Sequence, residues 1–178
     1  MSRLAVFCAA SPGERPLFAE SVASVGRLLA ERGIGLVYGG GGTGLMGVLA
    51  DAAMAAGGEV IGVIPAALVA KEQAHNGLSQ LHVVETMHER KALMSELADA
   101  FLALPGGYGT LDELFEAITW RQLKIHDKPC GLLDVDGYYA DLVAFLERAV
   151  REGFIRKTEL PKLLVGTDPG ALIDDLLS

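Results

Sequence analysis

Two glycine-rich turns, each placed directly after a short apolar run, constrain the fold more than any other feature of the sequence. Residues 39–43 follow the apolar run 34–38, residues 106–110 follow the apolar run 100–104, and both turns read G-G-x-G-T. Each turn leads into a segment with apolar residues at helical spacing. Glycines let backbone N–H groups approach a ligand, and the first turn of a helix offers unpaired N–H groups and a partial positive charge. This order of strand, glycine turn and helix predicts a site for an anion such as a phosphate.

The alternation of apolar runs and amphipathic segments extends along the whole chain. The predicted strands cover residues 4–9, 34–38, 60–64, 81–85, 100–104, 129–133 and 162–165. The predicted helices cover residues 15–32, 45–56, 87–98, 111–124, 138–152 and 169–177. Residues 66–80 carry neither pattern and are predicted to form a loop that covers a site. Repeated strand–helix units are typical of an α/β fold, a doubly wound parallel sheet of about seven strands with helices on both faces.

Length and composition favour a single domain over residues 1–178, because 178 residues with 51% hydrophobic content can form one well-buried core. There are 23 acidic and 15 basic residues, and the net charge of -8 argues against binding to nucleic acid or to anionic membranes. No apolar run approaches the ~18 residues of a membrane span. Cys8 and Cys130 both lie in apolar, strand-like runs, which favours buried free thiols in a reducing cytoplasm over a disulfide.

The first turn also satisfies the G-x-G-x-x-G spacing of dinucleotide sites, through Gly39, Gly41 and Gly44 and again through Gly42, Gly44 and Gly47. We rank a dinucleotide site low, because that fingerprint follows the first strand of its unit and needs an acidic residue at the end of the next strand. Here the next strand ends in Ile64 and Pro65, and Glu59 lies at its other end. Neither turn continues into Gly-Lys-Ser/Thr, which excludes a P-loop. Tight packing alone is the remaining alternative for the glycines of either turn.

A second group of reactive side chains lies in residues 86–94. Thr86 and Glu89 have the spacing of a capping box, which predicts a helix that begins at Met87. Positions i, i+3, i+4 and i+7 of this helix share one face, and they are Met87, Arg90, Lys91 and Met94. Two cations on such a face favour a phosphorylated, partly apolar ligand. The alternative is a solvated charged face whose methionines pack under a neighbouring element.

Glu113, three residues after Thr110, has two interpretations. The two residues repeat the capping-box spacing, so Glu113 can serve to cap the helix predicted over residues 111–124. Alternatively, its carboxylate lies beside a phosphate-binding turn, where it stabilises positive charge developing on a sugar or orients a water molecule. Asp112 favours the helix N-terminus electrostatically, and Glu116 is either a helper or a surface residue.

These motifs resemble those of a known family. Residues 105–113 resemble the PGGxGTxxE signature, and residues 87–91 the arginine-lysine partner motif, of the LOG family of cytokinin riboside 5'-monophosphate phosphoribohydrolases. The resemblance extends over nearly the whole chain, including residues 6–8 and 38–47. It implies a Rossmann-like homodimer that hydrolyses the N-glycosidic bond of N6-substituted adenosine 5'-monophosphates, giving free base and ribose 5-phosphate. Some members carry a lysine decarboxylase label, but nothing in this sequence indicates a pyridoxal phosphate site.

The resemblance also implies roles for individual residues. Arg90 and Glu113 would be the catalytic pair. The resemblance implies substrate contacts for Lys91, Gly107, Tyr108, Gly109 and Thr110 and, from less distinctive surroundings, for Glu72 and Thr119. The glycine turns and the helix face of residues 87–94 add further expected substrate-binding residues: Gly41, Gly42, Thr43, Met87 and Gly106. One departure concerns the first loop, where the family reads C-G-S-S-x-G and residues 8–13 read C-A-A-S-P-G. The loss of a glycine and of a hydroxyl removes backbone freedom and a hydrogen-bonding group, so affinity or substrate choice is expected to differ.

We therefore expect an enzyme whose glycine turns hold a 5'-phosphate at helix N-termini, aided by Arg90 and Lys91, and whose Glu113 stabilises an oxocarbenium-like ribose. We expect no metal or redox cofactor, because the three clustered histidines lack ligand-like spacing with cysteine or carboxylate: His75, His82 and His88. The expected partner is a small nucleoside 5'-monophosphate in the cytoplasm. Two other functions stay open, a broader nucleosidase acting on AMP itself and a non-catalytic nucleotide or cofactor carrier on the same fold.

Overall fold

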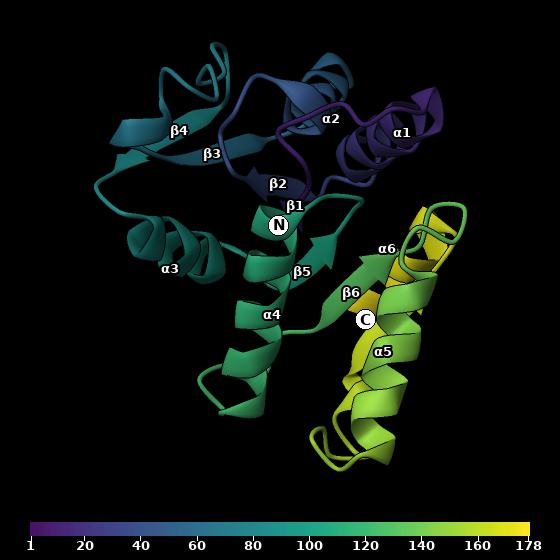
Figure 1. Cartoon of the computed structure of the whole chain (residues 1–178). Helices are drawn as coiled ribbons and strands as arrows, with labels where there is room; N and C mark the ends of the chain where they lie inside the picture. The colour runs from purple at the N-terminus through teal and green to yellow at the C-terminus, as the bar shows by residue number, and fades with distance from the viewer.

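Seven strands in the order β4-β3-β2-β1-β5-β6-β7 form one sheet in the computed structural model, which describes residues 1–178 (Figure 1). All neighbouring strands run parallel. The strands are β1 (Arg3–Phe7), β2 (Gly35–Tyr38), β3 (Val60–Pro65), β4 (Gln80–Val84), β5 (Ala100–Ala103), β6 (Cys130–Leu133) and β7 (Leu163–Gly166). The predicted fold class is confirmed.

Six α-helices cover the two faces of the sheet. They are α1 (Pro16–Glu31), α2 (Gly44–Ala55), α3 (Met87–Leu97), α4 (Tyr108–Gln122), α5 (Ala140–Arg151) and α6 (Pro169–Leu177), with short 3-10 turns η1 (Ala66–Leu68) and η2 (Leu160–Lys162). Helices α1, α2 and α6 pack on one face and α3, α4 and α5 on the other. In Figure 1, α4 accordingly crosses in front of β5, and α5 crosses in front of α6. None of the helices combines the length and apolar character needed to cross a membrane.

Alternate residues of each inner strand face opposite helical layers. In β1, Leu4 and Val6 pack in the layer of α1, α2 and α6, whereas Ala5 and Phe7 pack in the layer of α3, α4 and α5. None of the four is more than 4% exposed. Because both faces of the sheet are covered, an inner strand is apolar at every position, which explains the unbroken apolar runs in the sequence.

The direction in which strands are added reverses at β1, which lies between β2 and β5. The chain first adds β2, β3 and β4 on one side of β1 and then returns to add β5, β6 and β7 on the other side. The connections that leave β1 and β5 lead to helices on opposite faces, which opens a crevice at the carboxyl ends of these two strands. The loop of residues 8–13 and the turn of residues 104–107 both lie at this crevice.

Helix α4 begins at Tyr108, three residues earlier than the sequence predicts. Its N-cap is Gly107, so Thr110 and Glu113 lie inside the helix and the predicted second capping box does not form. The first capping box does form, because the hydroxyl of Thr86 accepts a hydrogen bond from the backbone N–H of Glu89 at 3.1 Å. Most other boundaries differ from the prediction by one or two residues, within the usual fraying of element ends.

Helices α1 and α2 approach each other closely at Gly26. A Cβ atom at this position would lie 2.6 Å from the carbonyl oxygen of Leu49 and 3.1 Å from the Cβ of Ala52. The nearest atom belongs to the backbone of α2, so relief requires movement of a helix rather than rotation of a side chain. The absence of a side chain at Gly26 therefore sets the distance between the two helices.

We predict that Gly26→Ala lowers the free energy of unfolding by up to about 2 kcal/mol. Overpacking costs roughly 1–3 kcal/mol, and the better helix propensity of alanine offsets about 1 kcal/mol of this. Urea denaturation followed by circular dichroism measures the change. Arg27→Ala is the matched control, because Arg27 is exposed on the same helix and makes no ion pair. Equal stability of Gly26→Ala and Arg27→Ala would contradict the close-packing explanation.

Candidate active site

A cleft of about 450 Å³ opens at the crevice beside β1 and β5. Its wall combines the loop after β1, the first turns of α3 and α4, and the loop of residues 66–79. The lining residues are Cys8, Ala9, Ala10, Ser11, Met46, Leu68, Glu72, Met87, Arg90, Gly107, Gly109, Thr110 and Glu113. The volume falls within the range typical of small-molecule sites. The loop that the sequence predicts to cover a site contributes Leu68 and Glu72 to this wall.

The N-terminus of α4 offers free hydrogen-bond donors to the cleft. The first backbone bond at this end runs from Leu111 N to Gly107 O, so the N–H groups of Tyr108, Gly109 and Thr110 have no backbone acceptor. A Cβ atom at Gly107 or Gly109 would meet nothing within 4 Å, and both glycines line the cleft. Unpaired N–H groups at a helix N-terminus bind anions, and this end of α4 can bind a phosphate.

Helix α2, which follows the other G-G-x-G-T turn, has two of its first three N–H groups occupied by the protein. Leu45 N donates to Ser11 O at 3.3 Å, and Met46 N donates to Ala9 O at 3.1 Å. Gly42 N donates to the carbonyl oxygen of Glu72 at 3.1 Å. The structure therefore places the three residues predicted in this turn behind the cleft wall, where they support the loops that form it: Gly41, Gly42 and Thr43.

Arg90 is buried, with only 4% of its surface exposed. Its Nε donates to Val63 O at 3.0 Å, and its Nη2 donates to Gly39 O at 2.6 Å. The same Nη2 lies 3.4 Å from a carboxylate oxygen of Glu72. A Cβ atom at Gly39 would lie 1.9 Å from Nη2, so this position requires glycine. These contacts fix the guanidinium plane, and Nη1, whose nearest partner is the sulfur of Met87 at 3.8 Å, completes the cleft wall.

Glu113 lies on α4, partly buried in the cleft wall, and its carboxyl group forms no ion pair with a protein side chain. Burial raises the pKa of Glu113 to about 7, against the opposing charge of Arg90. Asp112 and Glu72 raise this pKa further, and Lys91 lowers it. A carboxyl group without a protein partner beside a fixed guanidinium is available to a ligand, and a pKa near neutrality suits it for acid–base or charge-stabilising chemistry.

Two neighbouring tyrosines hold the turn before α4 in place. The hydroxyl of Tyr138 donates to Gly106 O at 2.7 Å, and the hydroxyl of Tyr139 donates to Leu104 O at 2.6 Å. A Cβ atom at Gly106 would clash with the side chain of Thr110, whose buried hydroxyl has no hydrogen-bond partner within the protein. The sequence analysis missed both tyrosines, because contacts between β5 and the β6–α5 loop leave no local sequence signal.

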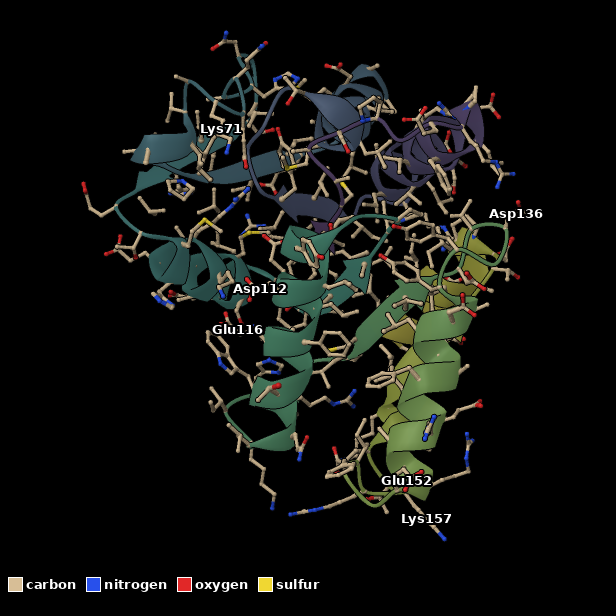
Figure 2. The ribbon with its side chains drawn as sticks, viewed as in Figure 1. Lys71, Asp112, Glu116, Asp136, Glu152 and Lys157 are labelled. Atoms are coloured by element: carbon tan, nitrogen blue, oxygen red, sulfur yellow. The ribbon has the colours of Figure 1, made fainter.

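The remaining predicted residues point away from the cleft. Lys91 forms ion pairs with Asp112 at 3.1 Å and Glu116 at 2.8 Å. Figure 2 shows these two carboxylates on the side of α4 that faces α3. The side chains of Tyr108 and Thr119 line a separate surface hollow on α4. No group of three or more metal-ligating side chains is present.

The sequence is similar to a known family and to named proteins. The family model described as "Possible lysine decarboxylase" matches residues 46–176. A rice (Oryza sativa subsp. japonica) protein, "Probable cytokinin riboside 5'-monophosphate phosphoribohydrolase LOGL5", is 52% identical over 153 residues, 86% of this chain and 62% of that protein. The "Cytokinin riboside 5'-monophosphate phosphoribohydrolase" of Rhodococcoides fascians is 49% identical over 164 residues, 92% of this chain and 83% of that protein.

Solved structures share the fold at lower sequence identity. The molybdenum cofactor binding protein of Rippkaea orientalis superposes with a TM-score of 0.73 at 21% identity, covering 99% of this chain and 98% of that chain. This likeness concerns the fold alone, whereas the family model and the two relatives cover most of the sequence and confirm the resemblance of its motifs. The chain therefore belongs to the family described as "Possible lysine decarboxylase", the LOG family, which includes proteins named cytokinin riboside 5'-monophosphate phosphoribohydrolases.

Proposed function

We propose that this protein hydrolyses the N-glycosidic bond of N6-substituted adenosine 5'-monophosphates, releasing the free base and ribose 5-phosphate. The observation that carries the proposal is the position of three groups around one cleft: the free N–H groups of α4, the fixed guanidinium of Arg90 and the unpaired carboxyl of Glu113. The names of the relatives support the same substrate class. Both buried cysteines are free thiols, which supports the proposed cytoplasmic location.

The geometry supports separate roles for the groups that line the cleft. The N-terminus of α4 holds the 5'-phosphate, and Gly107 and Gly109 line the cleft at this end of the helix. As the bond between the base and C1' of the ribose breaks, positive charge develops on the sugar, and the carboxylate of Glu113 stabilises it. Water adds to C1', one of its protons ends on the released base, and Arg90 fixes the substrate beside Glu113. No step in this sequence changes an oxidation state.

We further propose a homodimer that forms across the outward face of α4. Large apolar side chains lie exposed along this side of the molecule: Tyr108 is 96% exposed, Leu123 65% and Ile125 63%. A hollow of about 460 Å³ on the same helix is lined by Tyr108, Leu111, Asp112, Phe115, Glu116, Thr119 and Trp120. A contiguous exposed apolar face of this kind is typical of an interface between subunits. It also gives Thr119 a role outside the cleft of its own subunit.

Leu123→Glu is expected to convert the dimer into a monomer, because it places a charge in the centre of an apolar contact. Size-exclusion chromatography with light scattering measures the mass. Val165→Glu is the control, since Val165 is also an exposed apolar residue. It lies on β7, an edge strand of the sheet, and not on α4. A monomeric wild-type protein at micromolar concentration would refute the proposed dimer.

Glu113→Gln is expected to reduce base release at least 100-fold while leaving the fold intact, because the amide keeps the size of the carboxyl group and loses its charge. Chromatography detects the free base after incubation with N6-isopentenyl-AMP, with AMP and with the N6-isopentenyl nucleoside. Glu96→Gln, which changes an exposed glutamate of α3 without an ion pair, is the control.

Near-normal turnover of Glu113→Gln would remove Glu113 from the mechanism. Release from AMP as well as from N6-isopentenyl-AMP would favour the broader nucleosidase, and release from none would favour a carrier.

We expect the free energy of unfolding to depend on pH through the ionisation of Glu113. Because burial raises the pKa of Glu113 to about 7 from an ordinary value of 4.5, the folded state holds this proton more tightly than the unfolded state. The wild-type protein therefore loses stability relative to Glu113→Gln as the pH rises from about 4.5 through about 7, by about 1–3 kcal/mol. Denaturation of both proteins between pH 4.5 and 8.5 measures the difference. If the difference in unfolding free energy between the wild type and Glu113→Gln does not change with pH, water screens the carboxyl group fully.

A further inference from the structure

Lys91 follows Arg90 in the sequence, but its ammonium group serves a different part of the structure. Its Nζ lies 3.1 Å from Asp112 and 2.8 Å from Glu116, and its side chain is only 10% exposed. Both carboxylates belong to α4, and Figure 2 shows them along the side of this helix next to α3. Lys91 is absent from the cleft wall, where Arg90 and Glu113 meet. Its charge is thus already satisfied by the protein.

Few other contacts fix α3 relative to α4. The only side chains of α3 that are fully buried are those of Arg90 and Met94, and Leu93 and Leu97 are partly buried. A narrow gap remains between the two helices, lined by Lys91 and Ser95 from α3 and by Glu113, Ala117 and Trp120 from α4. The Lys91 pairs are the only ion pairs that connect the two helices. The Lys91 pairs therefore supply the charged link between α3 and α4, beside the apolar core that both helices share.

We propose that Lys91 is a positioning residue that clamps α3 to α4 through Asp112 and Glu116, and that this clamp brings Arg90 and Glu113 to their working distance. The inference rests on the proposed hydrolase function and assigns Lys91 a role other than the substrate contact that the family resemblance implies. Arg90 comes from α3 and Glu113 from α4, so any change in the distance between these helices moves one catalytic group away from the other. A misplacement of about 1 Å in an active site can cost on the order of 100-fold in rate.

The clamp also sets the charge around Glu113. The groups that face its carboxyl are Arg90 and Lys91 from α3, Asp112 from α4, Glu72 from the loop of residues 66–79 and the neutral thiol of Cys8 after β1. Lys91 lowers the pKa of Glu113, whereas Asp112 raises it. Loss of the lysine and loss of its carboxylate partners therefore displace the titration of Glu113 in opposite directions, although both break the same clamp.

The test compares Lys91→Met with the double variant Asp112→Asn/Glu116→Gln and with the triple variant that combines them. Both Lys91→Met and the double variant are expected to lower kcat by about 10- to 100-fold with KM changed less than about threefold, because the phosphate site of α4 is intact. The acid limb of the kcat/KM profile should move to higher pH in Lys91→Met and to lower pH in the double variant. The triple variant should lose no more than Lys91→Met, because the three residues form one unit.

Lys162→Met is the matched control, since Lys162 forms an ion pair with Glu159 at 2.9 Å far from the cleft. If Lys91 instead contacts the substrate phosphate, Lys91→Met will weaken inhibition by ribose 5-phosphate and raise KM, while the double variant will behave as the wild type. That result would overturn the proposal. An inactive wild-type protein would refute the proposed function alone. In that case crystal structures of the same variants test the clamp: a longer distance between Arg90 and Glu113 than in the wild type supports it, and an unchanged distance overturns it.

Discussion

The buried guanidinium of Arg90 is the interaction on which the site depends. A buried charge is costly unless protein groups satisfy it. Here two carbonyl oxygens at the ends of β2 and β3 accept its hydrogen bonds, and Glu72 supplies an opposite charge from the loop that covers the cleft. One side chain of α3 thereby connects the sheet, the covering loop and the catalytic cleft. Gly39 is required for the same reason, because any side chain there would occupy the position of Nη2.

Glu113 represents the opposite case, a carboxyl group that the protein leaves without a partner. Burial raises its pKa to about 7, so its ionisation works against the folded state. Residues held in this way cluster at functional sites, where stability is lost in exchange for a group that is ready to interact with a ligand. The structure also excludes one of the two interpretations of Glu113 in the sequence. Because α4 begins at Tyr108, Glu113 lies more than one turn inside the helix and cannot cap it.

The sequence was sufficient to predict the order of strands and helices and the parallel sheet, and the two residues of its proposed catalytic pair, Arg90 and Glu113, line the same cleft. These features depend on local periodicity and on motifs that are continuous in the chain. What could not be predicted depends on contacts between distant segments. The turn before α4 is held by Tyr138 and Tyr139, which follow β6, and this contact lets the helix begin at Tyr108. Arg90 and Lys91 are neighbours in sequence, yet one points into the cleft and the other toward α4.

The two G-G-x-G-T turns show most clearly how tertiary context overrides a local pattern. Both precede a helix, but the carbonyl oxygens of Ala9 and Ser11 occupy two of the first three N–H groups of α2, whereas the donors of α4 stay free. The difference arises at β1, because the loop that leaves this strand crosses the N-terminus of α2 and only borders that of α4. The same loop carries the departure from the family pattern, and Ala9 and Ala10 line the cleft without a hydroxyl group. Ser11 is then the only hydroxyl that this loop offers, so the proposed binding of a phosphate would rest mainly on the backbone of α4.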